Sequence, residues 1–293
     1  MYSSSIPTTE ILYATDFSEP ARRALACAKQ IARRRGIFLR ALHVIDLTSQ
    51  TGPAHSSFNA TIESARRSLR ITRRQLRLAG VREGATVISG GSISLAIRDA
   101  AIRYHATLLV MGLHGEPSIS SPTFGGNVRR LFRSSPCPIL TVGLRGPDNP
   151  APAFDRVLFV TDASLESVAA ARQAWPLDPQ PRTIAHFIVL PADATPESAK
   201  QIDGSPALAT RTIVALREAT DLILAKAADL QPNLIVIGLR SGGCLDTLSL
   251  GSVMRSIWTR CACPVLIARA AGEPEAPLRE RFAAARNRRP PAS

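Results

Sequence analysis

The sequence predicts an α/β fold made of two tandem domains, each with a parallel β-sheet covered by helices. Three observations indicate this fold. The chain has 293 residues, about twice the length of a typical domain of roughly 150 residues. Short apolar runs alternate with segments of helical periodicity, which is typical of parallel sheets with right-handed crossovers. Finally, ILYATDFS at 11–18 repeats as VLFVTDAS at 157–164, so the second half restarts the pattern of the first.

Local signals place the elements of the first half. Residues 11–14 form a short apolar run, and Ser18 is a suitable N-cap for a helix over 19–35 that tolerates Pro20 in its first turn. Gly36 ends that helix. Further strands are expected at 38–45, 87–88, 108–111 and 139–142, and further helices at 60–79, at 92–104 and after the Gly125-Gly126 pair.

The second half repeats this order in a shorter form. The distance from Asp16 to Asp162 is 146 residues, whereas the distance from Gly112 to Gly238 is 126, so 20 residues are missing between these landmarks. Strands are expected at 156–161, 183–189, 210–216, 234–238 and 265–268, with a helix at 218–230. The missing part falls where the first half has its helix at 60–79. We therefore expect a first domain at 1–145, a Pro-rich linker at 146–155, a shortened second domain at 156–270 and a basic tail at 271–293.

Composition limits the class of protein. The apolar runs are far shorter than the ~18 residues of a membrane span, and the first residues lack the basic and apolar regions of a secretory signal. Five cysteines without framework spacing favour a reducing compartment, so we expect a cytoplasmic protein. Cys137 and Cys263 precede equivalent strands and are expected to be small core residues.

The net charge of +13 is concentrated in the first half, where residues 1–148 account for +11. The helix expected at 60–79 carries an arginine stripe formed by Arg66, Arg70, Arg73 and Arg77. One interpretation is a contact for nucleic acid, an anionic surface or an acidic partner. The other is a solvated face in a chain that uses 33 Arg and only 3 Lys. No aromatic residues lie between the arginines, which argues against stacking on bases.

A glycine-containing motif spans residues 107–143. An apolar strand ends at Gly112, where glycine can adopt a positive φ, and Gly125-Gly126 precede a helix. The bare amides and the positive dipole end of such a helix favour a phosphate, and Arg129 and Arg130 add positive charge. The alternative is that the glycine pair only begins a helix. The motif recurs in the second half, where Gly238 and Gly251 are again 13 positions apart.

These marks together resemble the nucleotide-binding motif of the universal stress protein family, in a tandem form. The resemblance covers roughly 6–145 and 154–270 and includes the strand-one aspartates, the spaced glycines and the Cys-Pro before the last strand. Two positions depart from the pattern. Gly126 stands where a hydroxyl residue is usual, and Ser241 stands where the second glycine is usual.

The resemblance implies two doubly wound, five-stranded Rossmann-like domains of the adenine nucleotide alpha hydrolase-like type, with strand order 3-2-1-4-5. Strands one and four are then adjacent, and an adenine nucleotide (ATP or ADP, possibly with Mg) is expected in the crevice between their ends. The resemblance assigns to these sites Ala14, Thr15, Asp16, Val44, Gly112, His114, Gly115, Gly125, Gly126, Asn127 and Val128 in the first half, and Thr161, Asp162, Phe187, Gly238, Arg240, Ser241, Gly251, Ser252 and Val253 in the second. Phe187 is taken as the counterpart of Val44.

The same resemblance implies an intramolecular pseudo-dimer in which 139–142 and 265–268 are neighbours, with a homodimer also open. We expect a stress-response regulatory protein, and the first site to bind more tightly because it keeps all three glycines. Alternatives are a protein-interaction module with degenerate sites that do not bind nucleotide, and a weak ATPase. The residues contain no Walker sequence or triad, so neither a catalytic residue nor a metal site is assigned. His43 and His186 are expected to be structural, and Asp16 could alternatively cap the helix that follows it.

Overall fold

The computed structural model describes residues 10–46, 55–90, 92–113, 130–143, 145–147, 154–162, 164–174, 183–190, 209–240 and 256–270. The expected tail at 271–293 and most of the expected linker lie outside these residues. The segment at 191–208, where the second half was expected to be shortened, lies outside them too.

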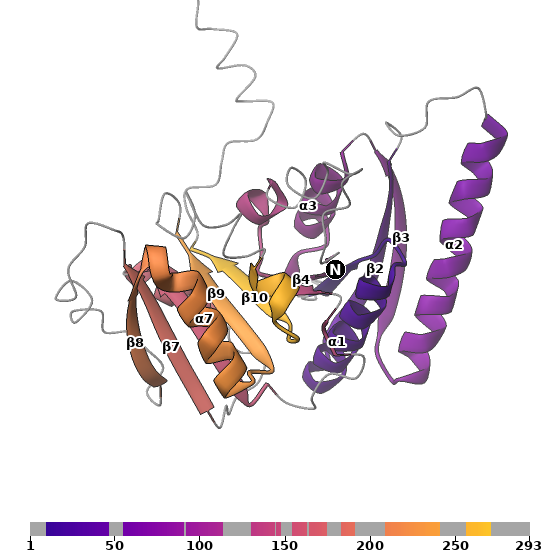
Figure 1. Cartoon of the computed structure of the whole chain (residues 1–293). Coiled ribbons are helices and arrows are strands. Elements are labelled where there is room, and N and C mark those ends of the chain that lie inside the picture. The colour runs from indigo at the N-terminus through magenta and orange to yellow at the C-terminus, as the bar shows by residue number, and fades with distance from the viewer. Residues whose placement is uncertain are drawn as a thin grey trace, which may run out of the picture.

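All described strands belong to one ten-stranded sheet, in the order β3-β2-β1-β4-β5-β10-β9-β6-β7-β8 (Figure 1). The strands of the first half are β1 (Glu10–Ala14), β2 (Phe38–Asp46), β3 (Glu83–Gly90), β4 (Ala106–Gly112) and β5 (Ile139–Val142). Those of the second half are β6 (Arg156–Asp162), β7 (Thr183–Leu190), β8 (Ala209–Ala215), β9 (Leu234–Leu239) and β10 (Val265–Arg269). Each half therefore has the predicted order 3-2-1-4-5, and the prediction is confirmed.

Helices cover both faces of the sheet. The helices are α1 (Glu19–Arg35), α2 (His55–Leu78), α3 (Ile93–Arg103), α5 (Leu165–Ala174) and α7 (Leu216–Leu230), and residues 130–134 and 256–260 are also helical. One apolar core joins α1, α2 and α5 to the sheet, through Ala24, Leu69 and Ala170. The other joins α3 and α7 to the opposite face, through Ile97 and Ile223. Each half is therefore doubly wound, since its crossover helices lie on both faces.

The boundaries of α1 follow from its end signals. Ser18 Oγ accepts a hydrogen bond from Ala21 N at 3.4 Å, which satisfies one of the free amides at the helix start. Gly36 ends the helix in the left-handed region at φ 63°, as glycine does without steric cost. By contrast, α2 begins at His55, five residues before the expected start, and β3 spans eight residues where only Val87 and Ile88 were expected. Serines in the first turn of α2, and Glu, Gly and Ser in β3, hid these extensions from a search for apolar residues.

The two halves meet where β5 pairs antiparallel with β10, whereas all the other strand pairs are parallel. Thr141 Oγ1 donates to the carbonyl oxygen of Val265 at 3.0 Å, and Trp258 Nε1 donates to Thr141 Oγ1 at 3.0 Å. The Trp258 ring also stacks on Phe132 of the first half, with ring centroids 5.5 Å apart. The final strands are therefore neighbours, as predicted, and the two halves form a pseudo-dimer around a buried, hydrogen-bonded junction.

Candidate functional site

The first crevice lies at the carboxyl ends of β1 and β4. These strands are parallel neighbours, and Ala14 at the end of β1 is aligned with Met111 of β4. Asp16 lies two residues beyond Ala14, and Gly112 lies one residue beyond Met111. The two positions singled out in the sequence are thus brought to the same edge of the sheet. This edge is the switch point from which helices lead to opposite faces, the usual place for a ligand in such a sheet.

The loop after β1 presents the Asp16 carboxylate to solvent. Asp16 Oδ1 accepts a hydrogen bond from Ser18 N at 3.0 Å, which orders the turn into α1, and the residue is exposed. The buried Thr15 fixes the base of the loop, because its amide donates to Leu42 O at 2.9 Å and its Oγ1 accepts from Phe17 N at 2.9 Å. The Asp16 side chain therefore orders the turn before α1, whose N-cap is Ser18, and its Oδ2 has no hydrogen-bond partner among the described residues.

Phe17 has the unusual backbone of this loop. Its φ of 66° lies in the left-handed region, which costs about 1–3 kcal/mol for a residue with a side chain. This conformation places the Phe17 ring against the His43 ring, with centroids 4.6 Å apart and an interplanar angle of 29°. His43 Nδ1 donates to Thr15 O at 2.8 Å, which orients the imidazole. His43 is therefore held in a structural role, as expected, although it is only half-buried.

A cavity of about 430 Å³ opens beside this stack, between the ends of β1 and β2 and the first half of α2. Its lining consists of Phe17, His43, Ala60, Thr61, Ser64, Ala65 and Ser68. The expected adenine position, Val44, is half-buried and packs against the core on the opposite face of the sheet. The cavity and Val44 therefore lie on different faces of the sheet at this edge.

Gly112 and Gly238 serve close packing rather than an unusual φ. The positive-φ glycines among the described residues are Gly36 and Gly80, so the expectation of a positive φ at Gly112 is wrong. A Cβ on Gly112 would lie 2.3 Å from Ala21 N, and a Cβ on Gly238 would lie 2.0 Å from Ser167 O. Each glycine therefore lets the first turn of a helix approach the end of strand four.

The second crevice has the same strand topology but a different environment for its aspartate. Asp162 is the last residue of β6 and is only 2% exposed, whereas its counterpart Asp16 is exposed. One carboxylate oxygen of Asp162, Oδ1, accepts a hydrogen bond from Ser164 Oγ. The other oxygen, Oδ2, is buried without a hydrogen-bond partner among the described residues. Burying a carboxylate in this way is costly unless a cation compensates its charge.

Arg240 supplies that cation. It follows β9, the fourth strand of this half, and its Nε lies 3.4 Å from Asp162 Oδ2. The Arg240 side chain is 43% exposed, so the pair joins a buried carboxylate to a half-exposed guanidinium at the mouth of the crevice. Both residues were assigned to the second site from the sequence, but as separate ligand contacts. The structure brings them together as an ion pair.

The strand pairings show which residues of β2 and β7 correspond to each other. Ala14 of β1 is aligned with Leu42 of β2, and Val160, which corresponds to Ala14 in the repeat, is aligned with Phe187 of β7. Phe187 therefore corresponds to Leu42, and like Leu42 it is buried in the core. The expectation that Phe187 is the counterpart of Val44 is wrong.

The histidines of these strands explain the error. His43 and His186 look equivalent in the sequence, yet His186 is aligned with Phe159 inside the sheet, two positions away from the place that corresponds to His43. His186 is 1% exposed and its Nε2 lies 2.8 Å from Thr161 Oγ1, so it is structural, as expected. Val189 occupies the place that corresponds to Val44.

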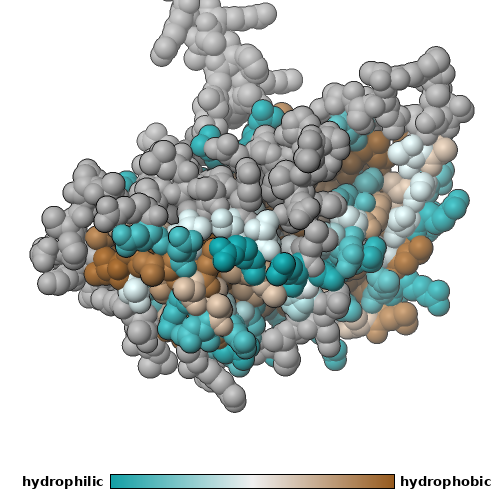
Figure 2. Space-filling view, viewed as in Figure 1, coloured by the Kyte–Doolittle hydropathy of each residue, from teal (hydrophilic) through white to brown (hydrophobic). Residues whose placement is uncertain are grey.

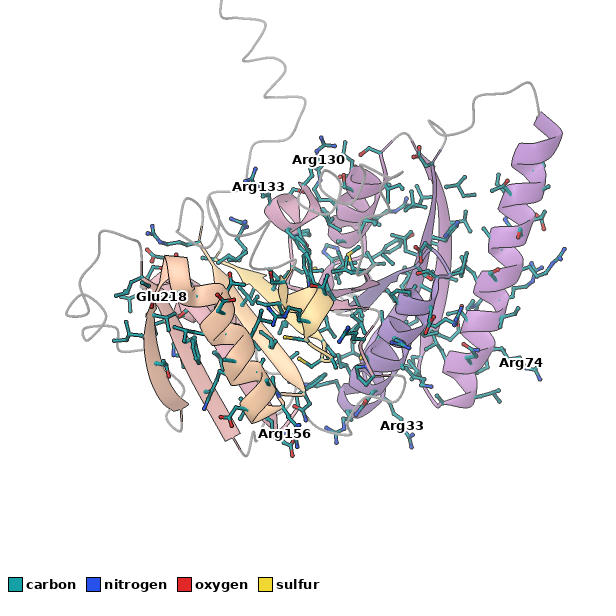
Figure 3. All side chains as sticks on the ribbon, in the orientation of Figure 1. Arg33, Arg74, Arg130, Arg133, Arg156 and Glu218 are labelled. Carbon is teal, nitrogen blue, oxygen red and sulfur yellow. The ribbon has the colours of Figure 1, made fainter. Side chains whose placement is uncertain are left out.

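The expected phosphate-binding segments lie outside the described residues. These are His114, Gly115, Gly125, Gly126, Asn127 and Val128 in the first half, and Ser241, Gly251, Ser252 and Val253 in the second. Arg130, at the start of the helical stretch 130–134, is described and exposed, and Figure 3 shows it with Arg133 on one side of the molecule, beyond the edge of the sheet.

The described cysteines do not form a reactive or metal-binding group. Burial raises the pKa of the Cys27 thiol to about 12 and that of Cys137 to about 11, so both stay protonated near neutral pH. Burial also raises the pKa of Cys263, which is 7% exposed and packs in the core as expected. Within the described ranges no three His, Cys, Asp or Glu residues gather as metal ligands would, nor is any helix there long and apolar enough to cross a membrane.

Two features of the crevices were missed from the sequence. The Phe17 stack depends on a left-handed residue, which no sequence pattern around Phe17 indicates. The Arg240–Asp162 pair could have been inferred, because adjacent strands one and four place residues 162 and 240 side by side. The signal in the sequence was the opposite charge of the residues at positions 162 and 240.

Comparisons with known proteins agree with this architecture. Residues 8–143 and 175–269 match the model of the universal stress protein family. A universal stress protein of Thermus aquaticus is 32% identical over 133 residues, which cover 45% of this chain and 96% of that protein. Among solved structures, a universal stress protein from Archaeoglobus fulgidus has a TM-score of 0.67 at 18% identity. The superposed part covers 91% of this chain and 98% of that protein's chain. A functionally unknown protein from Pseudomonas aeruginosa has a TM-score of 0.55 at 16% identity, covering 90% of this chain and 93% of its own. Because the family model matches well over half of the residues, in two segments, the chain belongs to the universal stress protein family.

Proposed function

We propose that this protein binds an adenine nucleotide, ATP or ADP, in its first crevice and serves as a regulatory protein of the stress response. The observation that supports this most directly is the arrangement of Asp16 and Gly112. The exposed Asp16 carboxylate stands at the end of β1, and Gly112 stands at the end of the neighbouring strand β4. Membership of the universal stress protein family adds the expectation of a nucleotide at this edge of the sheet.

Asp16 is suited to hold the sugar of the nucleotide. Its Oδ1 is used by Ser18 N, so Oδ2 remains to accept a hydrogen bond from a ribose hydroxyl. The short loop anchored by Thr15 keeps the carboxylate oriented before the ligand arrives, which reduces the ordering cost of binding. In this proposal the backbone at Val44 meets adenine, and the segment from Gly112 to Val128 meets the phosphates, with Mg²⁺ carried on them.

The second crevice is proposed to bind nucleotide more weakly. Its Asp162 carboxylate is buried and already engaged by Ser164 and Arg240. A ribose hydroxyl would have to displace Arg240 and expose Asp162 before it could form the same hydrogen bond. The asymmetry therefore favours one occupied site per chain, in the half that also carries most of the positive charge.

The proposed role is binding and regulation in the cytoplasm rather than dedicated catalysis. Slow ATP hydrolysis remains the alternative for an enzymatic activity, and a protein-interaction module that binds no nucleotide remains the alternative for a binding role. Two readouts distinguish these alternatives from our proposal when Mg-ATP is added to the protein. Release of inorganic phosphate would indicate the ATPase, and the absence of a heat of binding would indicate the interaction module.

Calorimetric titration of the full chain with Mg-ATP, Mg-ADP and Mg-GTP tests the proposal. We expect saturable binding of the adenine nucleotides and weaker binding of Mg-GTP. Asp16→Ala removes a hydrogen bond to a charged group, worth about 1.5–3 kcal/mol, so affinity should fall by roughly 10- to 100-fold. The matched control is Asp99→Ala, which removes an exposed carboxylate from α3 and should leave affinity unchanged. Heat of dilution alone with folded protein, or equal losses in both variants, contradicts the proposal.

A further inference from the structure

A groove separate from both crevices runs between α2 and the edge strand β3. It encloses about 260 Å³ and is lined by Arg66, Leu69, Arg70 and Arg73 from α2 and by Ala85, Thr86 and Val87 from β3. In Figure 1, α2 stands along the outer end of the sheet beside β3. Leu69 is buried and forms the apolar floor, so the three arginines form a basic wall above it.

The groove borders an open sheet edge. β3 is the last strand in the order, and among the described strands only β2 pairs with it. Leu39 N donates to Arg82 O, and Leu39 is aligned with Glu83. In a parallel ladder this alignment turns the backbone groups of Ala85 and Val87 outward. Both residues line the groove, so their outward N–H and C=O groups, which no described strand pairs, stand next to its basic wall, where a further strand can pair.

The arginines of this helix already bind carboxylates. Glu83 accepts from Arg73 Nε and from Arg77 Nη2 at 2.9 Å, and Glu63 accepts from Arg66 Nη1 at 2.8 Å. The pairs with Arg73 and Arg77 hold the pKa of Glu83 below its ordinary value, chiefly through the hydrogen bond from Arg73. Arg70 has no ion-pair or hydrogen-bond partner among the residues described. The Arg70 guanidinium in this wall can therefore still bind an additional carboxylate.

The outward side of α2 adds apolar surface. Ile71 is 57% exposed and Leu78 is 80% exposed, and on the helix they alternate with Arg67 and Arg74 at spacings of three and four residues. Figure 3 shows Arg74 projecting from α2 away from the sheet, and Figure 2 shows brown apolar residues among teal polar ones along this edge of the molecule. A mixture of exposed aliphatic and guanidinium side chains is typical of a surface that contacts protein.

We propose that the α2–β3 groove is the docking site for an acidic, extended segment of a partner protein, which adds a strand to β3 and places its carboxylates on Arg66 and Arg70. Two observations favour a protein over a nucleic acid. The backbone groups of an open edge suit another strand, and the arginines already pair with glutamates. In addition, no aromatic residue lines the groove for base stacking.

The probe is a fluorescein-labelled peptide of about twelve residues in which glutamate alternates with valine or threonine, so that one face of the strand is acidic. Its binding to the full chain is measured by fluorescence anisotropy near physiological salt, where generic surface attraction is screened. The variant Arg66→Gln/Arg70→Gln removes two charges from the groove. The control variant Arg33→Gln/Arg35→Gln removes two exposed charges from the last turn of α1, where Figure 3 places Arg33.

We expect the groove variant to weaken peptide binding by about tenfold and the control variant by less than about twofold. The same peptide with glutamine in place of glutamate should bind weakly. Two further peptides are N-methylated at alternate residues, one along each edge of the strand. One of these two should lose binding, because strand addition uses only one edge of the peptide. Equal losses in the two protein variants, or full binding of both N-methylated peptides, overturn the proposal. So does a single-stranded oligonucleotide that binds more tightly than the peptide and is lost in the same groove variant, because that result assigns the groove to nucleic acid.

Discussion

The two crevices of this protein share a strand topology but differ in their polar side chains. In each, Thr-Asp stands at or just beyond the end of strand one, and strand four ends at or next to a glycine. Asp16 in the first crevice is exposed, whereas Asp162 in the second is 2% exposed and lies against Arg240. The repeat has therefore kept the strand topology and changed the polar side chains at the ends of the strands. The first crevice presents an exposed carboxylate, and the second pairs its carboxylate with Arg240.

The conserved packing is easier to see in the structure than in the sequence. The family model matches the second half only from residue 175, so β6 and α5 fall outside the match. Nevertheless β6 lies between β7 and β9, the place that β1 occupies between β2 and β4. The half with the buried aspartate is therefore also the half whose first strand lies outside the family match.

The largest expected effect comes from the feature that both crevices share. Gly112→Ala and Gly238→Ala should each lower the free energy of unfolding by about 3 kcal/mol or more, because the new Cβ would meet the backbone of α1 at 2.3 Å or of α5 at 2.0 Å. Gly84→Ala is the control, since its nearest contacts are the movable side chains of Phe38 and Arg40. Chemical denaturation measures all three. A loss for Gly112→Ala no larger than for Gly84→Ala would show that the helix can move away.

The next effect separates the crevices. Asp162→Ala removes the buried partner of Arg240 and of Ser164 and should cost about 1–3 kcal/mol of unfolding free energy. Asp16→Ala removes an exposed carboxylate with one local hydrogen bond and should cost about 0.5 kcal/mol. Urea denaturation of the two variants under one set of conditions gives the comparison. Equal losses would mean that Asp162 is no more a part of the folded core than Asp16 is.

A smaller effect belongs to the first half alone, where Glu83 joins β3 to α2. The hydrogen bond from Arg73 lowers the pKa of Glu83 in the folded state. The contribution to stability is therefore complete above the ordinary pKa of a glutamate and is lost as pH falls through the lowered folded value. Relative to wild type, Glu83→Gln should cost less than about 1 kcal/mol near neutral pH and nothing in strong acid, because Arg73 is half-exposed and Arg77 is largely exposed. Denaturation as a function of pH tests this, and a difference that does not change with pH would assign the loss to packing.

Periodicity and end signals were sufficient to predict many of the elements. The bounds of α1 followed from the N-cap at Ser18 and the stop at Gly36, and those of β5 from a short apolar run. The order of strands in both halves was implied by the resemblance to the universal stress protein family, which rests on the recurring Thr-Asp and glycine positions. The early turns of α2 were missed because side chains there are mostly polar, and tertiary packing rather than propensity decides where such a helix begins. The same resemblance implied the β5–β10 junction, which the structure shows.

The interior of the crevices was predicted less well. The φ of Gly112 could not be read from the sequence, because glycine is chosen equally for a positive φ and for a close backbone approach. Phe187 was misaligned because His43 and His186, which recur by chance of composition, lie two positions apart in their strands. The left-handed φ of Phe17 depends on its hydrogen bond to Thr15 and on His43, which binds the same Thr15 but is distant from both residues in the sequence. Local patterns do not carry such information.

Photolabelling of the full chain with 8-azido-ATP, followed by peptide mass spectrometry, tests directly which of the two crevices binds nucleotide. When the 8-azido-ATP concentration is near the dissociation constant of ATP, we predict that the label falls on peptides of the first half and that excess Mg-ATP abolishes it. We predict further that Asp16→Ala removes the label, whereas Asp162→Ala lowers it only as far as it lowers the amount of folded protein. Label that concentrates on peptides of the second half, or that disappears only in Asp162→Ala, would contradict the claim that the first crevice is the open nucleotide site and the second is held by Arg240.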